Sequence, residues 1–93
     1  MVVGVVTWEL EVFGCQSLKQ KRSVVRSLKE RLRNRFNVAV AETGHTDLWQ
    51  RAEITACAVS NEAGLVDSVL ENADRFVNSD PRARVITARR LFL

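Results

Sequence analysis

Several residue types that mark particular protein classes are scarce in this chain of 93 residues. It has two cysteines, one histidine and one proline, and it has no tyrosine. Cys15 and Cys57 are too few for a disulfide scaffold or a four-ligand zinc site, and free thiols suit a reducing compartment. We therefore expect a cytoplasmic protein with no metal and no cofactor.

Long apolar runs are also missing. No segment approaches the roughly 18 apolar residues that a membrane-spanning helix needs. Glu9 and Glu11 interrupt the apolar start of the chain, which also lacks the basic residues that open a signal peptide. With 46% apolar residues, the chain is expected to form a single domain over residues 1–93, away from membranes.

The order of the expected elements defines the fold class. Alternation of side chains between Val2 and Val12 predicts a half-buried strand, and Ser17 with Gln20 forms a capping box that predicts a helix start. A second helix is expected to be capped by Asn61 and to stop at 79–81. Further strands are expected at 36–43, 52–60 and 83–92. The βαββαβ order predicts an α+β ferredoxin-like sandwich, with a four-stranded antiparallel sheet and two helices on one face.

The first expected helix carries a concentrated positive charge. The net charge of the chain is only +3, but residues 18–35 hold eight Lys or Arg residues against one Glu. On a helical projection the apolar residues fall on one side, and a basic stripe lies beside them. The stripe consists of Arg22, Arg26, Lys29 and Arg33, and its flanking contributors are Lys19, Lys21 and Arg51.

The basic stripe extends over about 16 Å of helix, so its four cations match a polyanion such as a nucleic-acid backbone. The stripe therefore predicts contacts to RNA phosphates. The alternative is a solvated helix face, or one that pairs with acidic residues of the second helix in the same or another subunit.

The connection at residues 44–51 holds further candidates. Leu48 and Trp49 are candidate partner-binding residues, since tryptophan and arginine are enriched at interface hot spots. The alternative is that both fold back over the sheet. His45 and Asp47 suggest a base and its orienting carboxylate, but no nucleophile stands beside them, so we expect no catalytic residues and no enzyme.

The sheet face opposite the helices is expected to be small and semi-apolar. It is either a partner surface, including one for a second copy of the chain, or a solvated face. RNA-recognition motifs stack bases on aromatic residues of their two central strands. Here the strand AEITACAVS has no aromatic residue, and Trp8 is in phase with the core. Any nucleic-acid contact is therefore expected at the first helix.

Three segments of the sequence are distinctive, namely SLKQKRSVVRSLKERLRNRFNVAVAE at 17–42, DLWQRAEI at 47–54 and AVSN at 58–61. Through them the whole chain resembles the YlxP-like family, a bacterial domain of unknown function. The resemblance implies a ferredoxin-like fold and genes that often lie beside those of translation initiation and ribosome-maturation factors. It implies no catalytic residues. Thr43-Gly44 departs from the valine-and-acid pair expected before the histidine, so no role is carried over to His45.

These observations lead to two hypotheses of function. The first is a small, non-enzymatic RNA- or ribosome-associated protein that contacts phosphates through the basic stripe. The alternative is a protein-interaction or homodimerisation module with no nucleic-acid role. No small-molecule substrate is evident.

Overall fold

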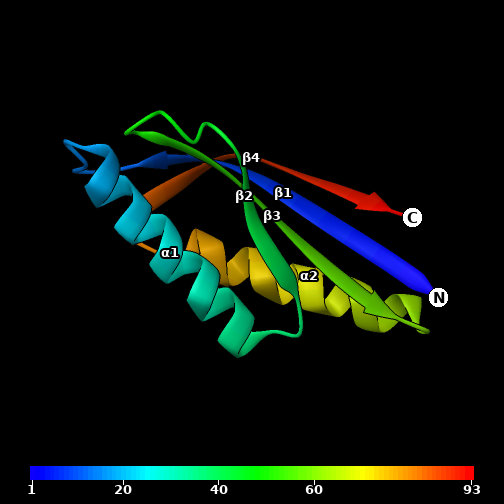
Figure 1. Cartoon of the computed structure of the whole chain (residues 1–93). Coiled ribbons are helices and arrows are strands. Elements are labelled where there is room, and N and C mark those ends of the chain that lie inside the picture. Colours follow the sequence, from blue (N-terminus) through cyan, green and yellow to red (C-terminus); the bar gives the residue numbers. More distant parts are fainter.

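The computed structural model describes all 93 residues and has six elements in the predicted order. The strands are β1 (Val2–Val12), β2 (Ala39–Gly44), β3 (Arg51–Ser60) and β4 (Ala83–Phe92), and the helices are α1 (Leu18–Arg35) and α2 (Ala63–Asn78). The sheet order is β2-β3-β1-β4, and every neighbouring pair is antiparallel. Both helices cover one face of the sheet and leave the other open (Figure 1). The predicted ferredoxin-like sandwich is confirmed.

The core lies between the helices and the covered face of the sheet. Alternation along β1 turns Val6, Trp8 and Leu10 toward the helices, and all three are buried. The Trp8 indole nitrogen donates a hydrogen bond of 2.9 Å to Asp74 of α2, so its one polar group is satisfied. Neither helix combines the length and the apolar character needed to cross a membrane.

The two helix starts differ in how well the sequence predicted them. Ser17 Oγ accepts a hydrogen bond from the Gln20 amide, and Gln20 Oε1 accepts one from the amide just before Ser17, so the predicted start of α1 is confirmed. The N-cap of α2 is Glu62, without a side-chain hydrogen bond, so the predicted Asn61 cap is wrong. Asn61 lies one residue before the cap, and it is Ser60 Oγ that accepts a hydrogen bond from the Glu62 amide.

β2 begins later than the predicted 36–43. Phe36 is the C-cap of α1, and its ring packs edge-on against Phe76 of α2, with centroids 5.9 Å apart. Because Phe36 is held between the helices, the chain uses residues 37 and 38 to reach the sheet edge, and pairing begins at Ala39.

A partly buried ion pair holds the connection between α2 and β4 against α1. The Asp80 side chain is only 3% exposed and accepts hydrogen bonds from Arg82 Nη2 at 2.7 Å and from Arg82 Nε at 3.0 Å. Arg82 Nη1 also donates to Ser27 Oγ of α1 at 3.1 Å. The hydrogen bond from Arg82 outweighs the effect of burial and holds the pKa of Asp80 below its usual range.

Candidate nucleic-acid interface

The predicted basic stripe lies on the flank of α1 that borders the edge strand β2. Arg22 and Arg26 are exposed and Lys29 is half-buried, and none of the three belongs to any of the ion pairs of the fold. Arg33 differs, because its Nη2 donates a hydrogen bond of 2.7 Å to the Val40 carbonyl of β2. Arg33 is therefore partly committed to the sheet edge, whereas the other three cations are free to meet a ligand.

The 14 Lys and Arg residues divide into paired and unpaired groups. Lys19, Arg22, Arg26 and Lys29 have no acidic partner, and all four lie on α1. Of the rest, Arg33 bonds a carbonyl, Arg35 lies over the Phe76 ring, and eight form ion pairs with carboxylates. Those eight are Lys21, Arg31, Arg51, Arg75, Arg82, Arg84, Arg89 and Arg90. The unpaired positive charge is thus gathered on one helix.

Lys21 does not belong to this surface, so its prediction as a phosphate contact is wrong. Its side chain is fully buried, and its ammonium bonds Glu42 Oε2 at 2.5 Å and the His45 carbonyl at 2.9 Å. Lys21 lies four residues before Val25 and eleven before Leu32, on the buried side of α1. This spacing is the signal in the sequence that identifies Lys21 as a core position.

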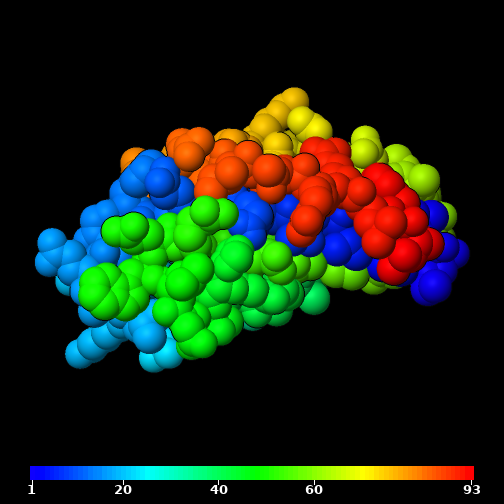
Figure 2. Space-filling model, turned by 90° about the horizontal axis from the view of Figure 1, so that it is seen from above, coloured from blue at the N-terminus to red at the C-terminus, as the bar shows by residue number.

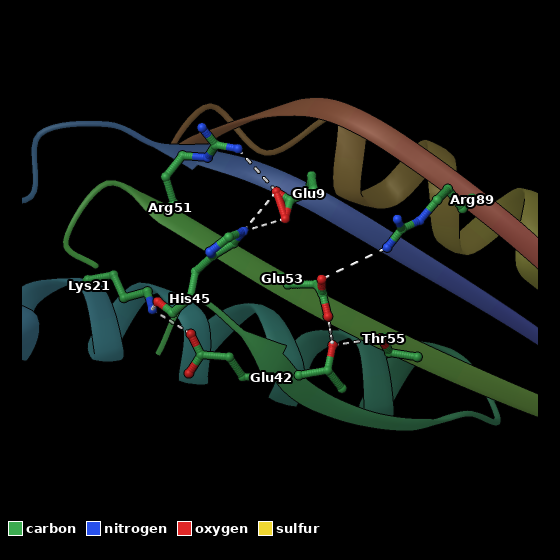
Figure 3. A network of polar contacts seen from close by, with 9 residues as sticks. Glu9, Lys21, Glu42, His45, Arg51, Glu53, Thr55 and Arg89 are labelled. Carbon is green, nitrogen blue, oxygen red and sulfur yellow. Dashed lines mark hydrogen bonds and ion pairs between the residues drawn. The ribbon is translucent and has the colours of Figure 1, made fainter. Parts of the chain in front are cut away.

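A charged network continues from Lys21 onto the open face of the sheet (Figure 3). The bond from Lys21 holds the backbone of His45, whose φ is 57°. His45 Nε2 lies 2.5 Å from Glu9 Oε1 of β1, and Arg51 Nη2 donates to Glu9 Oε2 at 3.2 Å. The carboxylate that orients His45 is therefore Glu9, not Asp47, and Arg51 is bound to Glu9 instead of standing free for a phosphate.

The neighbours of Glu9 decide its ionisation. Burial raises the pKa of Glu9, but the hydrogen bonds and charges of His45 and Arg51 outweigh burial and leave the pKa below its ordinary value. The ionised carboxylate keeps both partners over the open face. The hydrogen bonds of the His45 ring go to Glu9 and to no hydroxyl or thiol group, so the network contains no paired base and nucleophile.

A second polar cluster lies on the open face and joins side chains of all four strands. Thr43 Oγ1 donates to Glu53 Oε1 at 2.7 Å, and the Thr55 hydroxyl lies 2.8 Å from that of Thr43 and 3.1 Å from that of Thr7. Arg89 of β4 lies 3.9 Å from Glu53. These polar side chains bond one another, so this half of the open face carries two polar clusters, one around Glu9 and one around Glu53.

The other half of the open face, near the two chain ends, is apolar. Val5 pairs with Cys57 of β3 and with Leu91 of β4, and Val59 lies one step along the same face of β3. Val59 and Leu91 are exposed, and Figure 2 looks down on the face to which they belong. This surface has the semi-apolar character expected from the sequence and is the candidate contact for a protein partner.

Leu48 and Trp49 point away from the core. They are 48% and 51% exposed, and they line a surface depression of about 410 Å³ formed by residues 47–51. The Gln50 carbonyl accepts a hydrogen bond of 2.8 Å from the Val12 amide. The connection is therefore fixed to the end of β1, while its two large apolar side chains meet solvent.

A basic groove between the two helices was not predicted from the sequence. Arg31 and Arg35 of α1 lie over the Phe76 ring of α2, with their guanidinium carbons 5.3 Å and 5.2 Å from its centroid. With Arg75 they line a groove of about 470 Å³ between the helices. Arg31 and Arg35 occupy the flank of α1 that faces α2, and only the placement of Phe76 opposite them reveals the groove.

Comparisons with known proteins cover nearly the whole chain. The family model described as "Protein of unknown function (DUF503)" matches residues 3–90. The chain is 33% identical over 92 residues to the uncharacterized protein YlxP of Bacillus subtilis (strain 168). The match covers 98% of this chain and 100% of the relative. Both matches span α1, the charged network and the 45–51 connection. In agreement with the resemblance seen in the sequence, the chain belongs to the DUF503 family.

Proposed function

We propose that the chain is a small, non-enzymatic, cytoplasmic RNA- or ribosome-associated protein, and that α1 is its contact surface. The observation that carries the proposal is the segregation of unpaired charge. Lys19, Arg22, Arg26 and Lys29 are the four cations with neither a carboxylate, a carbonyl nor an aromatic ring as partner, and they share one helix.

Unpaired cations suit a phosphate backbone. Each Lys or Arg that contacts a phosphate releases condensed counterions, and this release drives binding at low salt without reading sequence. A cation already bound to a carboxylate would first have to leave that partner. Arg22 and Arg26 are therefore the strongest contacts, because an unpaired guanidinium can bind two phosphate oxygens at once.

Support for RNA over other polyanions comes from the family resemblance, which implies gene neighbours that act in translation initiation and ribosome maturation. The sheet is not the expected contact. The open face of β3 presents residues such as Thr55 and Cys57, and neither can stack on a base. The proposed mode is thus phosphate contact along a helix.

Anisotropy of a labelled ribosomal RNA fragment, measured at about 50 and about 200 mM salt, tests the proposal. The double variant Arg22→Glu/Arg26→Glu should lose affinity. For the wild type, log K should fall by about 0.7–0.9 per phosphate contact for each log unit of salt.

The matched control is Arg75→Glu/Arg84→Glu, which makes the same charge change at two exposed arginines that already have acidic partners. This control should bind nearly as well as the wild type. Equal losses in the two double variants, or no RNA binding at the lower salt, would reject the proposal.

A second candidate function is a homodimerisation module, and the exposed Val59 and Leu91 on the open face favour it. Sedimentation velocity at high micromolar concentration tests this reading. A wild-type dimer that dissociates in Leu91→Asp would support it, and a strict monomer would remove it.

A further inference from the structure

The exposed loop is bonded to the helix that carries the unpaired cations. The carbonyl oxygen of His45 accepts a hydrogen bond of 2.9 Å from Lys21 Nζ of α1 and one of 3.1 Å from the Leu48 amide. The loop that carries Trp49 is thereby fastened to α1 at a residue between Lys19 and Arg22. In Figure 2 the green connection lies against the light-blue start of α1, at the end of the molecule away from the two termini.

The two tryptophans have opposite environments. Trp8 is fully buried, and its indole nitrogen is bonded to Asp74. Trp49 is half-exposed, and the hydrogen bonds of its loop are made by backbone groups of Leu48 and Gln50, not by its own ring. A half-exposed indole outside the core, on a loop bonded to the helix of the unpaired cations, is a surface suited to a flat, negatively charged ligand.

We propose that Trp49 is a stacking platform for an unpaired base of single-stranded RNA, whose phosphates are held by Lys19, Arg22 and Arg26. This inference rests on the proposed function and adds the class of RNA. A duplex hides the faces of its bases, whereas a single strand presents them to aromatic side chains. Stacking on tryptophan is tolerant of sequence, since every base has a π-face.

The surroundings of Trp49 fit a base. The depression of about 410 Å³ lies within the size range of small-ligand sites, and Leu48 gives it an apolar wall beside the indole. Arg51 is held by Glu9 at 3.2 Å, so it borders the depression without occupying it. The single-stranded RNA is therefore expected to stack one base on Trp49 and to place its phosphates along the start of α1.

Intrinsic fluorescence provides a direct test, because Trp8 is buried and Trp49 is the accessible fluorophore. An oligouridylate strand of about 12 nucleotides, titrated at low salt, should quench the emission of the wild type. Trp49→Ala should weaken binding of the labelled strand by about 5- to 150-fold, and Trp49→Phe, which can still stack, should retain most of the affinity.

The salt dependence of binding separates stacking from charge. The slope of log K against log salt should be the same in Trp49→Ala and in the wild type, because stacking releases no counterions. The matched control is Phe92→Ala, an aromatic residue with 48% exposure at the opposite end of the sheet. This control should bind the strand as the wild type does, and circular dichroism should show all three variants folded.

Two results would overturn the inference while leaving the proposed function intact. One is a Trp49→Ala variant that binds the strand with wild-type affinity although Arg22→Glu/Arg26→Glu does not. The other is equal affinity for a duplex RNA of the same length, without quenching. If neither strand nor duplex binds at low salt, the proposed function itself fails.

Discussion

Lys21 of α1 and Glu42 of β2 form an ion pair beneath the edge of the sheet, with Nζ and Oε2 2.5 Å apart. The lysine side chain is fully buried and that of the glutamate is 15% exposed. Removing two charges from water offsets much of their attraction unless further hydrogen bonds satisfy them, and the His45 carbonyl supplies one. We therefore expect the pair to fix where the loop meets the helix more than to add net stability.

Breaking this pair from one side should be costly. Glu42→Gln would leave a buried ammonium without a counter-charge, and we expect the free energy of unfolding in urea to fall by about 2–4 kcal/mol. The double variant Lys21→Met/Glu42→Gln removes both charges and should be more stable than Glu42→Gln alone. A Glu42→Gln variant as stable as the wild type would contradict the expected role of the pair.

The lowered pKa of Glu9 predicts a pH-dependent contribution to stability. Folding favours the ionised form, so this contribution is complete above the ordinary pKa of 4.5 and is lost as pH falls through the lower pKa of the folded chain. Glu9→Gln should unfold at a lower urea concentration than the wild type at about pH 7, and the difference should shrink toward about pH 3.

Asp47→Asn is the control for Glu9, because Asp47 belongs to the same end of the molecule and makes no ion pair. It should unfold like the wild type at neutral pH. If Glu9→Gln lowers the urea concentration of unfolding as much in acid as at neutral pH, the ionised carboxylate is not what stabilises the fold.

The buried Asp80 predicts unequal effects at two nearby arginines. Arg82→Ala removes the main partner of a carboxylate that is 3% exposed, and we expect a loss of about 2–3 kcal/mol in the free energy of unfolding. Arg84→Ala breaks an exposed pair with Glu11 and should cost less than about 1 kcal/mol. Thermal or urea unfolding of the two variants checks the order, and equal losses would be inconsistent with it.

Arg33 should contribute more to the stability of the fold than to RNA binding. Arg22→Ala should reduce the slope of log K against log salt for RNA by about 1, whereas Arg33→Ala should reduce it by less. Arg33→Ala should also unfold at a lower urea concentration than Arg22→Ala, since the Val40 carbonyl at the sheet edge loses its donor. A larger loss of slope in Arg33→Ala than in Arg22→Ala would place Arg33 among the phosphate contacts, and a higher stability of Arg33→Ala than of Arg22→Ala would contradict its role at the sheet edge.

Local patterns explain why the topology could be predicted from the sequence. Alternation around Trp8 identifies β1, and Ser17 with Gln20 are close enough in sequence to identify the start of α1. The prediction of Asn61 as the N-cap was wrong because Ser60, Asn61 and Glu62 are adjacent in the sequence. The path of the chain out of β3 decides which of their side chains bonds a free amide.

The charged network depends on contacts that no local pattern contains. Glu9 and His45 are 36 residues apart and meet only when β1, β2 and β3 pair in their register. Lys21 was different, since its spacing from Val25 placed it on the core side. The general preference of lysine for the surface outweighed that spacing and led to the wrong prediction.

The His45 oxygen, shared by the Lys21 ammonium and the Leu48 amide, means that the loop is already ordered before a ligand arrives. Fixing the backbone of a mobile loop on binding would cost conformational entropy, at about 1–2 kcal/mol for each residue. In this fold the backbone of the loop gives up that freedom when the chain folds. Most of the interaction energy of a few contacts on this small surface can therefore contribute to affinity, because little of it is lost in ordering the loop.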